Sequence, residues 1–408
     1  MSKIMHINCA VAGSTGKIIA DIADCAVAEG YETLLCAPCA PGTNPNVRYF
    51  RTSFPCEQGL YRRLNRLFGL QYGFAPISTL RIKKRIQKES PDLVHLHCLN
   101  GYMVNVYDLF RFLKKRKIPT IITNHAEFFY TGGCPLAYEC DKWQTGCGGC
   151  PQVSVATGSK RDTTEWAWYK MKKALSGFEH AAMTSVSPWV GARAAKSPVA
   201  AELHQYVVMN GVNVEVFAPG EPAQLRKKYG LDPETKIVFH PTASFSASES
   251  DRKGGRFVME LARRLEHEKV LFLVAGRHSS GLEAPGNMVL LGHLADQMQL
   301  AEYYALADVT VVAGKSETFN MPVAESLCCG TPVVGFEAGG PESITIKEYS
   351  CFVPQGDVDA LTAGVRQMLN ASHDKRQIAD QAKQTYAAEQ MASGYLEIYR
   401  KLLSGRGV

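Results

Sequence analysis

The sequence predicts an α/β protein made of two doubly wound domains, each built on a parallel sheet, that face each other across a cleft. Short apolar runs, typical of buried strands, alternate with helical stretches, and this alternation is the pattern of parallel sheets. The series restarts after Pro219, which indicates a second domain of the same kind. The length of 408 residues suits two domains of about 200 residues each.

The expected strands form two series, separated at 210–222 by a stretch rich in Gly, Asn and Pro that predicts a linker. We therefore expect an N-terminal domain at 1–209, a C-terminal domain at 210–390 and a last segment at 391–408, whose helix can pack on either domain. The strands of the first series are expected at 4–11, 33–37, 93–96, 120–123, 182–186 and 206–209. Those of the second series are expected at 237–241, 270–275, 289–291, 309–313, 333–336 and 351–353.

The composition is that of a globular protein. Hydrophobic residues make up 46% and charged residues 21% of the chain, as in soluble domains. No apolar run reaches the roughly 18 residues of a membrane span, and the N-terminus lacks the features of a signal peptide. Thirteen cysteines, an odd number in a large chain, favour free thiols in a reducing compartment. We expect a cytoplasmic protein.

Basic residues are concentrated in the first half of a chain whose net charge is +6. Around Arg62, Arg63 and Arg66 they alternate with apolar residues at roughly helical spacing. Such a segment is typical of a helix that rests peripherally on the anionic inner face of a membrane. The alternative is a solvated helix face whose other side packs into the core. The sequence contains no nucleic-acid-binding motif, so nucleic acid is not an expected partner.

Two glutamates at 315–340 mark the strongest candidate site. Glu317 follows one expected strand, Glu325 lies on the next helix, and Pro322 suits the first turn of that helix. Free N–H groups at the helix start favour phosphate, and a carboxylate beside them accepts hydrogen bonds from sugar or ribose hydroxyls. The alternative is two ordinary helix acids, one of them favoured by the helix dipole. The amides concerned are those of Phe319, Asn320 and Met321.

Two further segments could hold phosphate. Gly13 and Gly16 lie in a turn after the first expected strand, where backbone amides can approach a phosphate or a sugar, although the spacing is neither that of a Walker A loop nor of G-x-G-x-x-G. The alternative is a tight strand-to-helix turn. Arg252 and Lys253 precede an expected helix at 256–265, where two cations can hold a diphosphate. Exposed pairs of this kind are also common without any ligand.

Histidines end two strands of the first series. His95 and His97 share one face of their strand, and His125 follows the next strand. At strand ends that open on a crevice, a histidine can contact a substrate hydroxyl or carry a proton. The commoner alternative is a buried histidine with a backbone partner.

A cysteine-rich insertion at 132–151 contains four thiols in a loop of Gly, Pro and polar residues. Four thiolates in a loop without its own core can bind a structural Zn²⁺, although only the last pair has the usual C-x2-C spacing. The alternative is four free thiols. The residues are Cys134, Cys140, Cys147 and Cys150.

Taken together, these segments resemble the retaining, nucleotide-sugar-dependent glycosyltransferases of family 4, which have two Rossmann-like domains in the GT-B architecture. Glu317 and Glu325 match the E-x7-E signature of that family, and the GTPVV and Gly-Gly-Pro-Glu stretches follow at 330–334 and 339–342. The resemblance covers nearly the whole chain. It is nearest to the branch that builds bacterial exopolysaccharide, capsule or colanic-acid-type polymers, some members of which share a similar cysteine insertion.

The resemblance implies a role for each candidate residue. Glu317 would bind donor-sugar hydroxyls, Glu325 the ribose hydroxyls, and Lys253 the diphosphate leaving group. Gly13 to Gly16 would form a loop over the phosphates, and His125 would approach the donor sugar. The donor would be a UDP- or GDP-sugar bound by the C-terminal domain. The acceptor, a glycan or polyprenyl-linked saccharide, would be bound by the N-terminal domain.

The resemblance further implies a hexosyltransferase-type reaction that needs no metal. The one Asp-x-Asp, at Asp357 and Asp359, precedes an expected helix and is better explained as its N-cap. One departure from the family pattern lies at Ser248, where many members carry an arginine whose charge Arg252 would have to supply. The rival functions are a non-catalytic partner or glycan-binding subunit of the same fold and a sugar-nucleotide epimerase.

Overall fold

A computed structural model describes residues 1–38, 42–220 and 222–405. The chain divides into two compact units. Unit 1 comprises Met1–Met209 together with Met391–Val408, and unit 2 comprises Asn210–Gln390. The last three residues of the segment expected at 391–408 lie outside the described residues. None of the described helices is long and apolar enough to cross a membrane.

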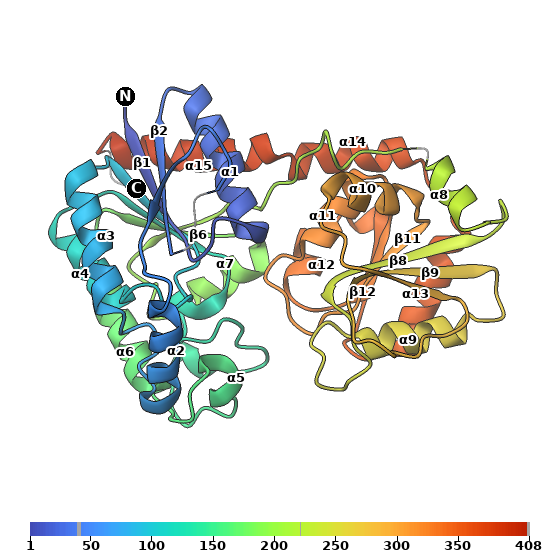
Figure 1. Ribbon diagram of the computed structural model, residues 1–408, viewed down its shortest axis with the longest axis horizontal. Coiled ribbons are helices and arrows are strands. Elements are labelled where there is room, and N and C mark those ends of the chain that lie inside the picture. Colours follow the sequence, from blue (N-terminus) through green and yellow to red (C-terminus); the bar gives the residue numbers. More distant parts are fainter. Residues whose placement is uncertain (39–41, 221, 406–408) are drawn as a thin grey trace. The chain divides into compact units, whose positions relative to one another are not determined.

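Unit 1 contains a seven-stranded sheet in the order β3-β2-β1-β4-β5-β6-β7, and every pair of neighbouring strands is parallel (Figure 1). The order reverses between β1 and β4. At such a switch point the two strands lead away in opposite directions and leave a crevice at their carboxyl ends, where ligands bind. The strands are β1 (Lys3–Ile7), β2 (Glu32–Ala37), β3 (Arg48–Arg51), β4 (Leu93–Leu96), β5 (Thr120–Asn124), β6 (Ala181–Ser185) and β7 (His204–Val207).

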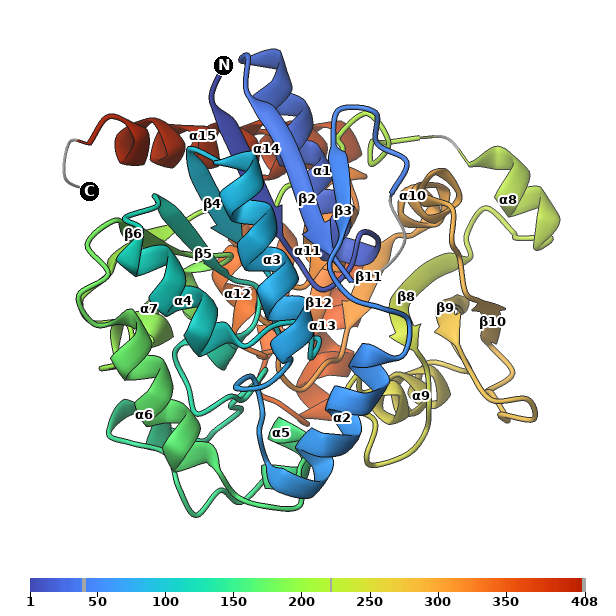
Figure 2. The ribbon, with the colours of Figure 1, turned by 60° about the vertical axis from the view of Figure 1, so that its left-hand side comes forward.

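Helices cover both faces of this sheet. On one face Ile82 and Phe110 pack against Met5 and Val94, which places α3 and α4 over the sheet as Figure 2 shows. On the other face α1 and the last helix, α15, bury their apolar sides. The helices of unit 1 are α1 (Gly13–Ala28), α2 (Glu57–Phe68), α3 (Pro76–Glu89), α4 (Val106–Lys115), α5 (Val153–Thr157), α6 (Thr164–Leu175) and α7 (Pro188–Ala195), with short 3-10 turns η1 (Glu127–Phe129) and η2 (Lys142–Gln144).

Helix α15 (Ala388–Leu403) begins in unit 2 and packs on the sheet of unit 1. Its residues Tyr395, Leu396 and Tyr399 share a core with Ile4 and Leu93, and all five side chains are almost fully buried. Burial of two tyrosines and a leucine on an apolar sheet stabilises this association by several kcal/mol, at about 1.5–3 kcal/mol for each large apolar side chain. The last helix therefore belongs structurally to unit 1.

Unit 2 contains a six-stranded parallel sheet in the order β10-β9-β8-β11-β12-β13, which reverses between β8 and β11. The strands are β8 (Lys236–Ser244), β9 (Val270–Arg277), β10 (Met288–Gly292), β11 (Val309–Val312), β12 (Val333–Phe336) and β13 (Ser350–Val353). The helices are α8 (Ala223–Lys228), α9 (Gly255–Arg264), α10 (Gln297–Leu306), α11 (Met321–Cys328), α12 (Gly340–Ile344), α13 (Val358–Asn370) and α14 (Lys375–Tyr386), with the 3-10 turn η3 (Lys347–Tyr349).

The expected strands all occur, with ends that differ by a few residues. The largest difference is in the first strand, which ends at Ile7 rather than at residue 11. The Asn8 amide group donates to the Ala10 carbonyl oxygen at 2.7 Å and to the Thr15 hydroxyl at 3.2 Å, and these local bonds turn the chain out of the sheet. The edge strand Arg48–Arg51 was not expected, because its two aromatic residues lie between two arginines and do not form an apolar run.

Candidate functional site

In unit 2 the loops after β8 and β11 meet at the switch point of the sheet. Lys253, just before α9, donates from Nζ to Glu317 Oε1 at 2.6 Å. The Glu317 side chain is 20% exposed and that of Lys253 is 41% exposed, so a ligand can reach both. The structure thus brings together a cation and a carboxylate that lie 64 residues apart in the sequence.

The position of Lys253 depends on its neighbours in the loop. Asp251 accepts hydrogen bonds from the backbone N–H of Lys253 at 3.0 Å and of Gly255 at 3.2 Å, so its carboxylate holds the entry to α9. Gly254 has a φ of +76°, and a Cβ atom there would collide with the carbonyl oxygen of Ala313, which follows β11. Only glycine suits this backbone angle and this close approach.

Glu317 is held through its backbone by the segment after β12. Its N–H donates to the Ala338 carbonyl oxygen at 2.9 Å, and its carbonyl oxygen accepts from Gly340 at 2.8 Å. A Cβ atom on Gly340 would lie 2.5 Å from the Thr318 carbonyl carbon, so glycine is again needed. Glu342 in turn accepts from the N–H groups of Ala338 and Gly339. The Gly-Gly-Pro-Glu stretch therefore fixes the Glu317 loop.

The start of α11 has the features expected of a phosphate-binding helix end. Asn320 occupies the N-cap with a φ of +75°, and Pro322 lies in the first turn. Within the part of the chain that the structure describes, the N–H groups of Phe319, Asn320 and Met321 have no backbone acceptor. Unpaired N–H groups at the start of a helix attract anions, so this end of α11 can receive a phosphate next to Glu317.

Glu325 lies one turn further along α11. The hydroxyl of Tyr304 donates to Glu325 Oε2 at 2.8 Å. Tyr304 is fully buried, and burial, followed by the negative charge of Glu325, raises its pKa well above the ordinary value. Tyr304 therefore stays protonated and orients the carboxylate, an arrangement that sequence reasoning missed because the two residues lie on different helices.

Arg252 is exposed, and its carbonyl oxygen accepts from the Lys315 N–H at 2.9 Å, which anchors the loop between the two strands. Ser248 is exposed too, with its hydroxyl 2.8 Å from that of Ser250. At the end of β8, His240 binds the Val311 carbonyl through Nδ1 at 2.8 Å, and burial lowers its pKa to about 4. This neutral histidine is a structural link between β8 and β11.

In unit 1 the turn at Gly13 opens α1, and Gly13 has a φ of +78°. A Cβ atom on Gly16 would lie 2.5 Å from the Val11 carbonyl oxygen, so the turn is tight at this position as well. Gly13, Gly16 and the exposed Lys17 line a cavity of about 410 Å³ that also reaches Tyr49. The cavity is large enough for a small polar ligand.

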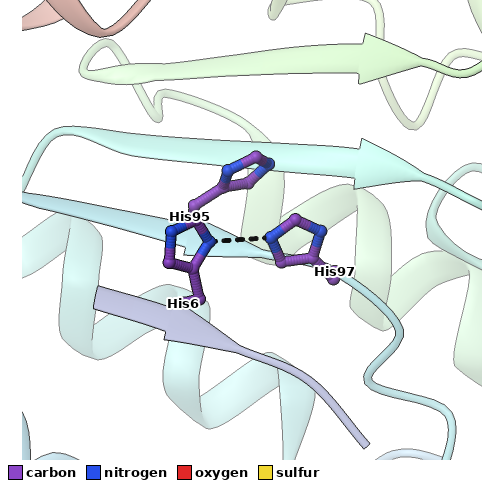
Figure 3. Close-up of side chains that lie close together, drawn as sticks. All are labelled: His6, His95 and His97. Atoms are coloured by element: carbon purple, nitrogen blue, oxygen red, sulfur yellow. Dashed lines mark hydrogen bonds between the residues drawn. The ribbon is translucent and has the colours of Figure 1, made fainter. Parts of the chain in front are cut away.

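The strand-end histidines of unit 1 contact one another (Figure 3). His95 and His97 are completely buried, as in the commoner of the two alternatives. Their partners are side chains and not backbone groups: His95 meets Tyr399 and Thr123 at 2.7 Å each, and His97 meets His6 and His125 at 3.1 Å each. The backbone partner of that alternative is absent from these contacts because Tyr399 of α15, 304 positions from His95, supplies a hydroxyl instead. His125 is the most exposed of the four histidines.

The four cysteines of the insertion line one small cavity, together with Trp143, and each carries a free thiol. The cavity has a volume of about 10 Å³, roughly the space of one water-sized sphere. Among the described residues, however, His6, His95 and His97 form the only group of three potential ligands with all ligand atoms within 4.8 Å of one another. The four sulfurs are thus gathered but not at the spacing of a closed zinc site, with its Zn–S distances of about 2.3 Å.

The basic segment at 57–68 forms helix α2, whose Leu60, Leu67 and Phe68 are more than half exposed. Its C-terminal end is joined to the start of α6 by a hydrogen bond from the Thr163 hydroxyl to the Gly69 carbonyl oxygen. On α6 two aromatic residues, Trp166 and Tyr169, are also exposed. The exposed apolar residues of α2 and α6, which we call the α2–α6 surface, are accompanied by the exposed arginines at positions 62, 63 and 66.

Aspartate 357 caps α13 by accepting a hydrogen bond from the Ala360 N–H at 2.9 Å. Asp357 is therefore the N-cap of α13, as expected, and Asp359 lies in the first turn.

Comparison with protein families finds two matches. A model described as Glycosyltransferase Family 4 matches residues 15–196, and one described as Glycosyl transferases group 1 matches residues 240–371. The first match lies in unit 1 and the second in unit 2.

Similar curated proteins include D-inositol 3-phosphate glycosyltransferases. The one from Frankia alni is 29% identical over 225 residues, which is 50% of this chain and 54% of that protein. The one from Mycobacteroides abscessus is 32% identical over 162 residues, 36% of this chain and 35% of that protein. The chain thus spans about a third to a half of the length of the curated relatives that it matches.

Solved structures with the same fold match the whole chain. Sucrose-phosphate synthase from Thermosynechococcus elongatus gives a TM-score of 0.70 at 20% identity and covers 99% of this chain and 100% of its own. Anabaena HepE in complex with UDP gives 0.67 at 14% identity, with coverage of 98% and 100%. These likenesses show that the two parallel-sheet units have the GT-B architecture, as the sequence predicts.

Proposed function

Because the chain joins a glycosyltransferase family 4 domain to a glycosyl transferases group 1 domain, we propose that it transfers a sugar from a nucleoside diphosphate sugar to a hydroxyl group of an acceptor. The acceptor is a glycan or a polyprenyl-linked saccharide, and the reaction belongs to bacterial surface polysaccharide biosynthesis. Unit 2 binds the donor and unit 1 the acceptor. The observation that carries the proposal is the contact between Lys253 and Glu317 at the switch point of unit 2.

This pair has the two kinds of group that a nucleotide sugar needs. The carboxylate of Glu317 accepts hydrogen bonds from hydroxyls of the sugar, and the ammonium of Lys253 attracts the diphosphate. Without a ligand the two groups neutralise each other at 2.6 Å. On binding, each exchanges its partner for a part of the donor, so neither charge is left buried and unpaired.

During transfer the diphosphate leaves with growing negative charge. Lys253, Arg252 and the N–H groups at the start of α11 stabilise that charge, which is the largest contribution that fixed groups make to such reactions. The acceptor oxygen bonds to the sugar carbon on the face that the diphosphate vacates, and the acceptor proton passes to the departing phosphate. The configuration of the sugar is retained. Lys253, Arg252 and the helix N–H groups stabilise the negative charge that a metal ion stabilises in other enzymes.

The nucleoside is held further along α11. Glu325, oriented by the Tyr304 hydroxyl, accepts hydrogen bonds from the two ribose hydroxyls. The complex of Anabaena HepE with UDP supports a uridine nucleotide as the first donor to test, and GDP-sugars follow from the resemblance to family 4. In unit 1, His125 and the turn from Gly13 to Gly16 are proposed as the sugar- and phosphate-binding groups that the resemblance to family 4 implies.

Nucleotide binding and transfer test this function separately. We expect a nucleoside diphosphate, or its sugar, to raise the melting temperature of the purified protein, since a ligand that binds only the folded state stabilises it. Glu317→Gln should reduce transfer by about 100-fold or more, because a charged acceptor is lost where the sugar binds. The matched control is Glu348→Gln, an exposed glutamate of the same unit. If no nucleotide shifts the melting temperature, the chain is instead a non-catalytic partner subunit.

The polyprenyl-linked form of the acceptor requires a membrane, and the α2–α6 surface suits one. Exposed Leu67, Phe68 and Trp166 would enter the interface, and the arginines of α2 would meet anionic headgroups. We expect the protein to sediment with phosphatidylglycerol vesicles but not with neutral ones, and to be released by salt. Changing Leu67 and Phe68 to serine should abolish binding, whereas Met298→Ser, an equally exposed residue of unit 2, should not.

Structural zinc in the cysteine insertion remains a proposal. The four sulfurs share a cavity of a suitable size, and Zn²⁺ would have to draw them together. It would hold the insertion in place and take no part in the transfer. Elemental analysis of the purified protein should find one zinc per chain, and its loss in a Cys147→Ser variant would locate the ion.

A further inference from the structure

Two cysteines lie side by side at the switch point of the unit 1 sheet. Cys9 follows β1 and Cys98 follows β4, each two residues beyond the last paired residues of these strands, Ile7 and Leu96. The backbone N–H of Cys9 donates to the carbonyl oxygen of Cys98 at 2.9 Å, so the two segments stay paired as far as the cysteines. This edge of a doubly wound sheet is the one that small molecules reach.

The two side chains also contact each other. The thiol of Cys98 donates a hydrogen bond to the sulfur of Cys9. Neighbouring strands lie about 4.8 Å apart, and a disulfide needs Cα atoms about 4.4–6.8 Å apart. The backbone therefore already has the spacing of a disulfide, and rotation of the two side chains can close the bond without movement of the strands.

The side chain of Asn8 fixes both segments. Its Oδ1 accepts a hydrogen bond from the N–H of Cys98 at 3.1 Å. Its Nδ2 donates to the Ala10 carbonyl oxygen at 2.7 Å and to the Thr15 hydroxyl at 3.2 Å. The Thr15 hydroxyl in turn contacts the Cys98 thiol. These contacts hold the two sulfurs together and favour this pairing among the thirteen cysteines of the chain.

The two thiols differ in reactivity. The hydrogen bond from Cys98 lowers the pKa of Cys9, whereas the same contact, followed by burial, raises the pKa of Cys98. Because the thiolate is the form that reacts with oxidants, Cys9 is the sulfur that reacts first. Cys36, in the neighbouring strand β2, is completely buried, and burial raises its pKa to about 12, so it stays inert.

The space around the pair suits a small oxidant. Both side chains are partly exposed, but the loop after β4 lies close to them. A Cβ atom on Gly101 would lie 2.7 Å from the Cβ atom of Cys9, and the Gly101 carbonyl oxygen accepts from Gln58 Nε2 of α2 at 2.8 Å. This loop is thus tied to α2, and it hinders a bulky disulfide such as oxidised glutathione more than hydrogen peroxide.

We propose that Cys9 and Cys98 are a redox-sensitive pair, which hydrogen peroxide converts to a reversible disulfide in the folded protein. The bond would join the segments that follow β1 and β4 at the switch point of unit 1. The proposal goes beyond the proposed sugar transfer and does not depend on it, because all the groups concerned lie in unit 1.

The reaction has two steps. In the first, the Cys9 thiolate attacks one oxygen of hydrogen peroxide, an S–O bond forms and the O–O bond breaks. The other oxygen leaves as hydroxide and becomes water with the proton that Cys9 has lost, and Cys9 is oxidised to a sulfenic acid. In the second, the sulfur of Cys98 attacks that of Cys9, the S–S bond forms and the S–O bond breaks. The hydroxide that leaves takes the Cys98 proton as a second water, and a dithiol restores both thiols by exchange.

Peptide mapping tests the pair without any sugar donor or acceptor. The full-length protein, reduced and then freed of reductant, is treated with hydrogen peroxide at neutral pH, blocked with N-ethylmaleimide, digested and analysed by mass spectrometry. We expect peptides linked through Cys9 and Cys98, and dithiothreitol added before blocking should remove the link. A bond from either residue to a third cysteine, or two free thiols when the exposed Cys56 is already oxidised, would overturn the proposal.

Variants distinguish the two sulfurs. In Cys98→Ser the sulfenic acid of Cys9 has no partner, so dimedone should label Cys9. In Cys9→Ser dimedone should leave Cys98 unlabelled, and a labelled Cys98 would refute Cys9 as the sulfur that reacts first. The matched control is Cys56→Ser, which changes an exposed thiol of the same unit and should form the link between Cys9 and Cys98 like the unchanged protein.

The melting temperature of unit 1 shows whether the bond fits the native backbone. A disulfide between residues about 90 positions apart restricts the unfolded chain, so peroxide should raise the melting temperature, followed by tryptophan fluorescence, by about 5 °C or more. Dithiothreitol should reverse the shift, and Cys9→Ser should not show it. A linked protein that melts at a lower temperature than the reduced one would show that the native strands do not accommodate the bond, which would overturn the proposal.

Discussion

Acidification should unfold unit 1 before unit 2. Unit 1 contains four histidines in contact, of which His6, His95 and His97 are completely buried and His125 is partly exposed, whereas among the described residues of unit 2 only His240 is a buried histidine. Burial is the main cause that lowers the pKa of each, and the mutual repulsion of neighbouring charged rings adds to it for His95 and His97. The buried groups that pack against the stack, Tyr395 and Tyr399 of α15, supply no negative charge, because burial raises the pKa of both.

The direction in which the stability of unit 1 changes with pH follows from proton binding. An unfolded histidine titrates near pH 6.5 and a folded one in this stack far lower, so between these values the unfolded state binds more protons and stability falls as the pH falls. At pH 5 each histidine with a folded pKa of about 4 or below favours the unfolded state by about 2 kcal/mol. His6 and His125, whose pKa values are lowered to about 3 and about 4, together contribute about 4 kcal/mol in unit 1. His95 and His97, whose pKa values lie well below the ordinary value, act in the same direction. His240 contributes about 2 kcal/mol in unit 2, and a whole domain is typically stable by roughly 5–15 kcal/mol.

Tryptophan fluorescence can follow unit 1 alone, because all four tryptophans of the chain, at positions 143, 166, 168 and 189, lie in it. The free energy of unfolding of unit 1, measured by urea unfolding followed by fluorescence, should lose most of its value between pH 7 and pH 5. Circular dichroism, which reports on both units, should then show a second unfolding transition, that of unit 2, whose midpoint changes less with pH. His6→Gln should lower the pH sensitivity of the first transition, while exposed His204→Gln should not. A fluorescence midpoint that is the same at pH 7 and pH 5 would refute the reasoning.

The other predictions concern the site of unit 2. Gly254→Ala should lower transfer strongly and stability by about 1–3 kcal/mol, because the left-handed backbone and the Ala313 carbonyl oxygen exclude a Cβ atom; a fully active variant would show that the loop is free to move. Tyr304→Phe should weaken nucleotide binding by about 5- to 10-fold through the loss of one hydrogen bond to Glu325, measured by calorimetry, and an unchanged affinity would remove Glu325 from the ribose site. Asp357→Ala should cost about 1 kcal/mol of stability as a lost N-cap and leave turnover intact. A chelator should not inhibit transfer. Loss of turnover in the variant, or inhibition by the chelator, would point to a metal-dependent reaction.

The proximity of Lys253 and Glu317 could be predicted from the sequence because each lies in a local motif. Glu317 and Lys253 both fall between a strand and a helix, and in a doubly wound sheet such positions meet at the carboxyl edge. What the motifs did not indicate is how the residues are held. The Gly254 contact with Ala313 and the Tyr304 contact with Glu325 depend on packing between segments that are far apart in the sequence.

By itself, the sequence determined the two parallel sheets, because apolar periodicity and turn residues act over a few positions along the chain. Only the tertiary structure decided which polar groups are buried. His95 and His97 face inward because α15, at the other end of the chain, covers their side of the sheet and supplies Tyr399 as a partner. His6, His97 and His125 come together because β1 and β4, which are not consecutive along the chain, are neighbours in the sheet, and β5 follows β4. Contacts of this kind depend on how distant segments pack, and no local pattern contains that information.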